Sequence, residues 1–188
     1  MPTDEIEFEC EEQMEKAVEF LRKELRGIRS GRASSGLVEY LKVPVESYGS
    51  TMDLRELASI AVTDGNQLVI KPFDPGTLKD VERAIQASDI GITPISDGKI
   101  IRLPVPPLSG ERRQKLLAQV SKLGENQKVA VRNVRREVNK KTDAAEKAKE
   151  ISEDEADQCK ENIQELIKKY EGLMDAAVAG KSREIQEG

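Results

Sequence analysis

Apolar residues recur at helical spacing in three long stretches of the chain. The first stretch runs from Glu5 to about Ser30, and its apolar positions lie three or four residues apart, on one stripe of a helix. These positions are Cys10, Met14, Ala17, Leu21, Leu25 and Ile28. A single apolar stripe predicts a helix that packs against other helices.

Two further helices are predicted in the second half of the chain. One begins after Ser109, a good N-cap, and keeps close to a seven-residue repeat for about 40 residues, which predicts a length of roughly 60 Å. Its stripe is Leu116, Val120, Leu123, Gln127, Ala130, Val134, Val138, Lys141, Ala145 and Ala148. The other begins at the capping box Ser152 to Glu155, with Cys159, Ile163, Leu166, Tyr170, Leu173 and Ala177 facing inward. Three helices with one stripe each predict a three-helix bundle.

Between Leu37 and Leu103 the pattern changes to short β-prone segments. The predicted strands are Leu41–Tyr48, Ser59–Thr63, Gln67–Lys71, Ile92–Ser96 and Lys99–Leu103. Asp-Gly pairs at 64–65 and 97–98 separate β-prone runs and suit tight hairpin turns. One helix is predicted at roughly Thr77 to Ala87, and Pro44 indicates an edge strand or a bulge. This segment therefore predicts a small α+β module.

Two unlike connectors bound the module. The first, Gly27 to Gly36, has three glycines and three serines, which predicts a flexible break, whereas the second, Pro104 to Leu108, has three prolines and is stiff. We predict an α+β protein with two domains. Residues 1–30 and 109–188 form an elongated three-helix bundle, and residues 31–108 form an inserted small α+β domain with its two connectors.

Charge is distributed unevenly along the chain. The net charge is −5, yet residues 1–20 hold eight acidic residues and one lysine, whereas residues 111–141 hold ten basic and three acidic ones. At helical spacing, five polar residues are expected on an exposed face away from Ala130 and Val134. They are Lys128, Arg132, Arg135, Arg136 and Asn139. Arginine binds phosphate through two parallel hydrogen bonds, so this face is a candidate for contact with structured RNA.

The pattern leaves two alternatives open. The arginines can belong to a solvated face and pair with acids of neighbouring helices, such as the glutamate-rich start of the first helix. The long stripes can also belong to a coiled-coil scaffold or a chaperone-like protein that forms oligomers. Sedimentation distinguishes such an oligomer from an elongated monomer, and we expect a monomer.

Enzyme signatures are absent from the sequence. There is no histidine, no Gly-x-Ser-x-Gly, no Walker loop and no Rossmann fingerprint, so we predict no catalytic residue and no cofactor. The two cysteines, Cys10 and Cys159, have no CxxC partner and lie on apolar stripes, so we expect buried free thiols and no metal site. No run approaches the roughly 18 apolar residues of a membrane span, and we expect a soluble cytoplasmic protein.

Five sequence runs, in order, resemble the ribosome recycling factor family. They are Ile28 to Ser34, Ala87 to Ile92, Ile101 to Ser109, Ala130 to Arg136 and Lys149 to Asp154. The resemblance extends from Met14 to about Gly180 and implies an L-shaped molecule of roughly transfer-RNA dimensions. The stretch from Val43 to Gly49 is about two residues longer than the family pattern.

The resemblance also implies a function, partners and sites. Members of the family bind the large ribosomal subunit through ribosomal RNA after peptide release. With elongation factor G and GTP they promote splitting into subunits and release of mRNA and tRNA, and they hydrolyse nothing themselves. The implied RNA-binding residues are Arg132, Arg135 and Arg136, joined by Lys128 from the basic face and by Arg29 and Arg32 near the connector. The implied hinge consists of Ser30, Gly31, Arg32, Ala33, Ser34, Val105, Pro106, Pro107 and Leu108.

Overall fold

A computed structural model describes residues 2–64 and 66–188, which divide into two compact units. The bundle unit consists of the N-terminal helix up to Leu25 together with Leu117–Ser182. The sheet unit consists of Arg26–Leu116 together with Arg183–Gly188. The predicted α+β class, with a helical bundle and a small α+β module, is confirmed.

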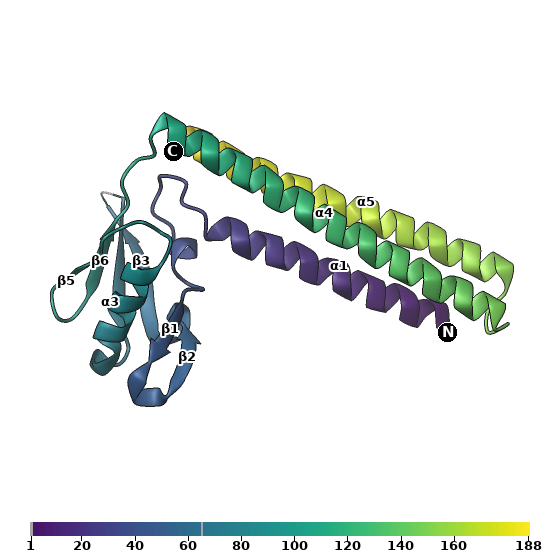
Figure 1. Ribbon diagram of the computed structural model, residues 1–188, viewed down its shortest axis with the longest axis horizontal. Coiled ribbons are helices and arrows are strands. Elements are labelled where there is room, and N and C mark those ends of the chain that lie inside the picture. Colours follow the sequence, from purple (N-terminus) through teal and green to yellow (C-terminus); the bar gives the residue numbers. More distant parts are fainter. Residues whose placement is uncertain (1, 65) are drawn as a thin grey trace. The chain divides into compact units, whose positions relative to one another are not determined.

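The bundle is formed by α1 (Pro2–Arg26), α4 (Gly110–Lys147) and α5 (Glu153–Glu187), which run side by side (Figure 1). Polar contacts join the helices: Lys141 of α4 pairs with Glu9 of α1 at 2.7 Å, and Asn162 of α5 donates to Glu7 of α1 at 2.9 Å. In the described part of the chain, no helix combines the length and apolar character needed to cross a membrane.

Most predicted inward positions are buried, among them Met14 and Leu21 of α1, Val120 and Val138 of α4, and Ile163 and Tyr170 of α5. At other places the buried position lies one residue from the predicted one. Val18, Val131, Ile167 and Met174 are buried, whereas their predicted neighbours Ala17, Ala130, Leu166 and Leu173 are only partly buried. The predicted inward positions Lys141 and Ala148 of α4 are exposed. An α-helix has 3.6 residues per turn, so a strict seven-residue repeat drifts around a long helix and the inward side changes residue along its length.

Gly124 of α4 packs closely against Val178 of α5. It is buried, and a Cβ atom added to it would lie 2.6 Å from Cγ2 of Val178. Only glycine fits at this position without a shift of the neighbouring side chain.

The helix ends follow the predicted capping signals. The Ser152 amide donates to Oε2 of Glu155 at 2.7 Å, and the Glu155 amide donates to Oγ of Ser152 at 3.3 Å, so the capping box is confirmed. At the start of α4 the Arg112 amide donates to Oγ of Ser109 at 3.2 Å. The end of α1 is different from the prediction, because the helix ends at Arg26 and not near Ser30.

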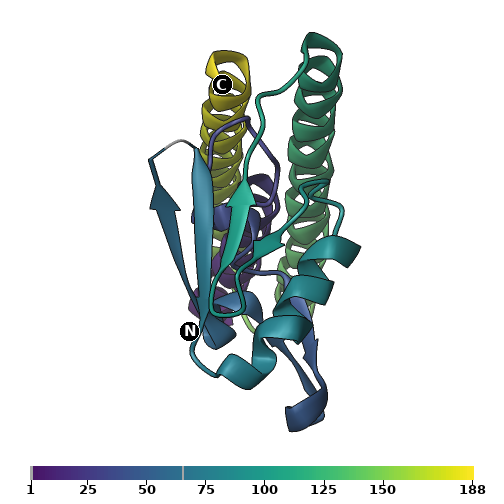
Figure 2. The same cartoon turned by 90° about the vertical axis from the view of Figure 1, so that its left-hand side faces the viewer.

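The sheet unit contains two antiparallel sheets, a short helix α2 (Leu54–Leu57) and a longer helix α3 (Leu78–Ala87) (Figure 2). The four-stranded sheet has the order β3 (Ala58–Thr63), β4 (Gln67–Pro72), β6 (Ile101–Pro104) and β5 (Ile95–Ser96). The two-stranded sheet pairs β1 (Lys42–Val45) with β2 (Ser50–Asp53). Val81 and Ile85 of α3 (Leu78–Ala87) share one buried cluster with Leu68, Ile70, Ile101 and Leu103 of the larger sheet. Three short 3-10 turns, η1 (Ser35–Leu37), η2 (Glu46–Tyr48) and η3 (Pro75–Thr77), connect these elements.

Several predicted bounds in this unit are wrong. The first predicted strand ends at Val45, because Glu46–Tyr48 form a 3-10 turn that leads into β2, and neither β2 nor the short helix α2 (Leu54–Leu57) was predicted. The predicted strand Ile92–Ser96 is limited to its last two residues. Pro44 does lie in an edge strand, opposite Thr51 in the two-stranded sheet.

The two predicted hairpins are formed by paired strands. The Asp97 amide donates to the Ile100 carbonyl at 3.2 Å, and Gly98 has a φ of +88°, so the turn between β5 and β6 is confirmed. In the other hairpin, Thr63 of β3 pairs with Gln67 of β4. The prediction for Gly65 lies outside the described residues.

Candidate nucleic-acid interface

Two of the predicted RNA-binding residues of α4 face the neighbouring helix α5. The Lys128 side chain is only 16% exposed, and its Nζ lies 2.5 Å from Oδ1 of Asp175. This hydrogen bond is the main reason why the pKa of Lys128 is raised. Arg135 is half-buried and donates from Nη1 to Oε1 of Gln164 at 2.9 Å.

The prediction that both residues lie on an exposed face is therefore wrong. The buried position between them is Val131, which is not among the predicted stripe positions. Lys128 precedes Val131 by three residues and Arg135 follows it by four, and residues at these spacings lie on the same side of a helix. Both side chains consequently flank the contact between α4 and α5.

Arg132 and Arg136 are exposed, as predicted. The Arg132 side chain is 47% exposed, and its Nε lies 3.0 Å from Oε1 of Glu171 on α5. The Arg136 side chain makes no ion pair or hydrogen bond to any residue within 2–64 and 66–188. Pairing with acids of neighbouring helices, the alternative interpretation, is thus found for Lys128 and Arg132, with α5 as the partner.

The glutamate-rich start of α1 pairs with lysines that do not belong to the predicted basic face. Glu9 pairs with Lys141 of α4 at 2.7 Å, and Glu11 pairs with Lys169 of α5 at 2.9 Å. Glu11 also accepts from the Tyr170 hydroxyl at 3.0 Å, and these contacts lower the pKa of its carboxyl, the Lys169 bond most. The acids of α1 therefore do not neutralise Arg132 or Arg136.

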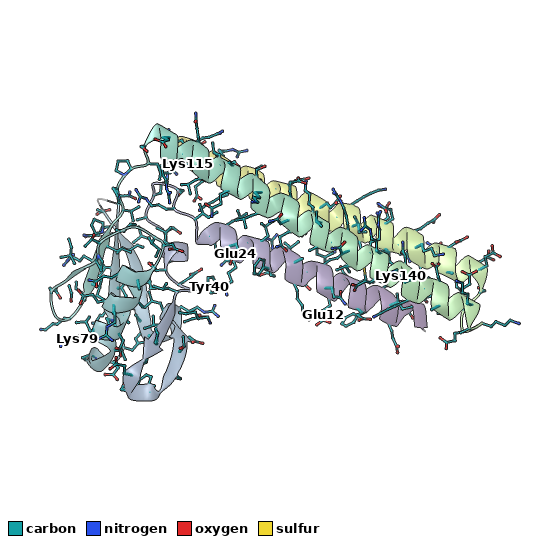
Figure 3. All side chains as sticks on the ribbon, viewed as in Figure 1. Glu12, Glu24, Tyr40, Lys79, Lys115 and Lys140 are labelled. Atoms are coloured by element: carbon teal, nitrogen blue, oxygen red, sulfur yellow. The ribbon has the colours of Figure 1, made fainter. Side chains whose placement is uncertain are left out.

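Lys140 extends the exposed basic surface by one more turn (labelled in Figure 3). It is exposed, and its side chain has neither an ion-pair nor a hydrogen-bond partner among the described residues. Four exposed residues, Arg132, Asn133, Arg136 and Lys140, form what we call the α4 basic face. The sequence interpretation missed Lys140, although its spacing of four from Arg136 was a usable signal.

A second basic group lies in the sheet unit, where the first connector meets the start of α4. Arg29 donates from Nη2 to the Pro106 carbonyl at 3.0 Å, and its Nε is buried without a hydrogen-bond partner. Burial, and then the nearby charge of Arg112, lower the pKa of Arg29. Arg32 is exposed, and its side chain makes no hydrogen bond or ion pair with another described residue. Arg112 was not among the predicted site residues.

Asn66 connects the two predicted hinge segments and was also missed. Its side-chain Nδ2 donates to the Gly31 carbonyl and to the Val105 carbonyl, both at 2.8 Å, and its Oδ1 accepts from the Ala33 amide at 2.5 Å. Its backbone has a φ of +59°, a conformation that asparagine tolerates better than most residues. That tolerance was the one signal available in the sequence.

Both cysteines are buried free thiols, as predicted. Burial raises the pKa of Cys10 to about 11, with a smaller effect from Cys159, and burial also raises the pKa of Cys159. Thiols in this state are poor nucleophiles and poor metal ligands. Within the described ranges, no group of three His, Cys, Asp or Glu residues is placed to hold a metal ion.

Comparison with known proteins assigns the family. The model of the ribosome recycling factor family matches residues 21–185 of the chain. The chain belongs to the ribosome recycling factor family. The ribosome-recycling factor of Symbiobacterium thermophilum is 45% identical over 185 residues, which cover 98% of this chain and 99% of the relative. That of Rhodopirellula baltica is 50% identical over 140 residues, which cover 74% of each chain.

Solved recycling factors share the fold. The solution structure of a ribosome recycling factor is 37% identical, with a TM-score of 0.77, and the match covers 100% of this chain and 99% of that one. A second match has a TM-score of 0.68 and 34% identity, over 98% of this chain and 99% of that one. It is the T. thermophilus ribosome recycling factor, in models with E. coli elongation factor G bound to the E. coli post-termination complex.

Membership in the recycling factor family confirms three predictions: the family itself, a role in ribosome recycling during protein biosynthesis, and a non-enzymatic mode of action. Recycling factors are translation factors that carry no catalytic site of their own. A coiled-coil scaffold is no longer needed to account for the long apolar stripes, because the bundle of a recycling factor contains them.

Proposed function

We propose that this recycling factor acts in the cytoplasm on post-termination ribosomes. It binds ribosomal RNA of the large subunit and, with elongation factor G and GTP, promotes separation of the subunits and release of mRNA and tRNA. The supporting findings are the family match and the likeness to a recycling factor that is bound, with elongation factor G, to a post-termination complex. Elongation factor G supplies the GTP hydrolysis.

The observation that carries RNA binding is the α4 basic face. Arg136 and Lys140 are exposed and have no acidic partner among the described residues, so their charge is available to phosphate. Arg132 has a partner, Glu171, but an exposed ion pair contributes only about 0–1 kcal/mol and is easily exchanged for a phosphate oxygen. The rigid helix sets the spacing of these contacts.

The remaining predicted RNA-binding residues take different roles in this proposal. Lys128 and Arg135 hold α4 against α5, since both are directed to partners on that helix. Arg29 and Arg32 form a second, smaller contact near the first connector, to which Arg112 adds charge. The factor acts as a monomer, with residues 1–30 and 109–188 as the RNA-binding arm and residues 31–108 as the small domain.

Binding to purified large subunits tests the proposal. The double variant Arg132→Ala/Arg136→Ala is expected to raise the dissociation constant by roughly 10- to 100-fold and to reduce the salt dependence by about one unit of slope per lost contact. The matched control, Arg22→Ala/Lys168→Ala, removes the same charge from exposed ion pairs on α1 and α5. Equal affinities of the two double variants would exclude the α4 basic face as the RNA contact.

A further inference from the structure

The two connectors and the β3–β4 turn are held together by one side chain. Asn66 follows β3 and immediately precedes β4 at Gln67. Its carboxamide bonds the first connector at Gly31 and Ala33 and the second connector at Val105.

The backbone of Asn66 adds a fourth bond to this arrangement. Its carbonyl accepts from the Val105 amide at 3.0 Å, which continues the β4–β6 pairing of Gln67 with Pro104 by one residue. Backbone groups in partly buried connectors need hydrogen-bond partners. Here one residue, Asn66, is the partner of the carbonyls of Gly31 and Val105 and of the amides of Ala33 and Val105. Asn66 therefore fixes parts of both connectors to the ends of the inner strands β4 and β6 of the four-stranded sheet.

We propose that Asn66 is a clamp that makes Gly31–Ala33 and Val105 one body with the four-stranded sheet, so that bending of the connectors is confined to residues 27–30 and 106–109. These two pivot segments have four residues each and lie between the clamp and the helices α1 and α4. They are tied to each other by the bond from Arg29 to the Pro106 carbonyl. The clamp divides the predicted hinge into a fixed part and a mobile part.

The clamp also has a consequence for recycling, and this consequence rests on the proposed function. If elongation factor G exerts a force on the small domain, that force reaches the two pivot segments only when the connectors move with the small domain as one body. With a loosened clamp, the connectors yield locally before the domain turns. Large-subunit binding through α4 is then retained, while the rate of subunit splitting falls.

Three variants separate the clamp from other effects on the turn. Asn66→Gly removes the side chain but keeps the positive φ, which glycine adopts without strain. Asn66→Asp keeps an acceptor for the Ala33 amide but cannot donate to the carbonyls of Gly31 and Val105. The control, Thr63→Val, removes a hydrogen bond to the Gln67 carbonyl within the same hairpin and touches neither connector.

Amide hydrogen exchange and carbonyl shifts, measured by NMR on the full chain, report on the clamp directly. Exchange of the Ala33 amide is expected to become about ten-fold faster in Asn66→Gly, the loss of one hydrogen bond, and to stay unchanged in Thr63→Val. In Asn66→Asp the Ala33 amide stays protected, while the carbonyl carbon resonances of Gly31 and Val105 shift. An Ala33 amide that exchanges equally fast with and without the Asn66 side chain overturns the proposal.

Paired spin labels give a second, independent measurement. Labels at Arg32→Cys and Lys71→Cys, with both native cysteines replaced by alanine, are expected to show one narrow distance distribution. That distribution broadens in Asn66→Gly and stays narrow in Thr63→Val, and equal widths in both overturn the clamp. Subunit splitting with elongation factor G and GTP is assayed separately. Failure of the unmodified protein to split ribosomes refutes the proposed function, whereas the exchange and distance measurements still decide the clamp.

Discussion

The close approach of α4 and α5 at Gly124 makes a definite prediction for Gly124→Ala. The new Cβ would lie 2.6 Å from Cγ2 of Val178, well inside the roughly 3.5–4.0 Å of an ordinary carbon–carbon contact. Valine is branched at Cβ and strongly prefers one χ1 rotamer in a helix, so its methyl group cannot turn away without strain. Relief therefore requires the two helices to move apart.

Two opposing effects set the magnitude. Alanine is favoured over glycine in a helix interior by about 1 kcal/mol. Overpacking of a well-packed contact costs about 1–3 kcal/mol. The expected net change is a loss of about 0–2 kcal/mol in the free energy of unfolding. In a Val178→Ala background the clash is absent, and the same glycine substitution should stabilise the protein by about 0.5–1 kcal/mol.

A double-mutant cycle measures the difference. Urea unfolding is followed by circular dichroism for the parent, each single variant and the double variant, and the coupling free energy is expected to be about 1–3 kcal/mol. Gly172→Ala and Gly180→Ala on α5 are matched controls, because a Cβ at either position meets nothing within 4 Å. Both controls should stabilise the protein. A coupling near zero, with Gly124→Ala as stabilising as the controls, would refute the close contact.

Three further predictions concern charge and thiols. The pKa of Glu155 is held below its usual range chiefly by the Ser152 amide, so its contribution to stability is present above the ordinary glutamate pKa and is lost as pH falls through the lowered value. As the pH is lowered below about 4.5, the urea midpoint of Glu155→Gln should therefore decrease less than the urea midpoint of the parent protein. Lys128→Ala should lower the free energy of unfolding by about 1 kcal/mol, since it removes a largely buried side chain and its ion pair from the contact with α5, whereas Arg136→Ala should change it by less than about 0.5 kcal/mol. Equal effects would contradict the assigned contacts. Buried Cys10 and Cys159 should react with a thiol reagent near pH 8 far more slowly in native than in unfolded protein, and equal rates would show that the bundle is open there.

Local signals made the long helices predictable. The N-cap Ser109 and the capping box at Ser152 act within one turn, and the apolar repeat is visible in any single helix. The inward direction was less certain, because it depends on where the partner helices lie. A shift of one residue placed Val131 in the core and turned Lys128 from the expected exposed face toward α5.

Features that depend on distant residues escaped prediction. Strand β2 has the polar sequence Ser50 to Asp53 and is a strand only because β1 pairs with it. Asn66 acquires its role from hydrogen bonds to residues 33 to 39 positions away, which no local pattern reports. The α4 basic face was found only in part, since exposure of Lys140 depends on how the three helices pack.

The ion pairs of α1 bear on how the protein approaches a ribosome. Helix α1 pairs Glu9 and Glu11 with lysines of α4 and α5, but its many other acidic residues keep it strongly negative. It belongs to the same unit as the α4 basic face, in a chain with a net charge of −5. Near a polyanion such a unit experiences a torque, because phosphate repels α1 and attracts Arg136 and Lys140. The acidic helix α1 would thereby disfavour encounters in which α1 faces the ribosomal RNA. Encounters in which the α4 basic face is directed toward the RNA would be favoured.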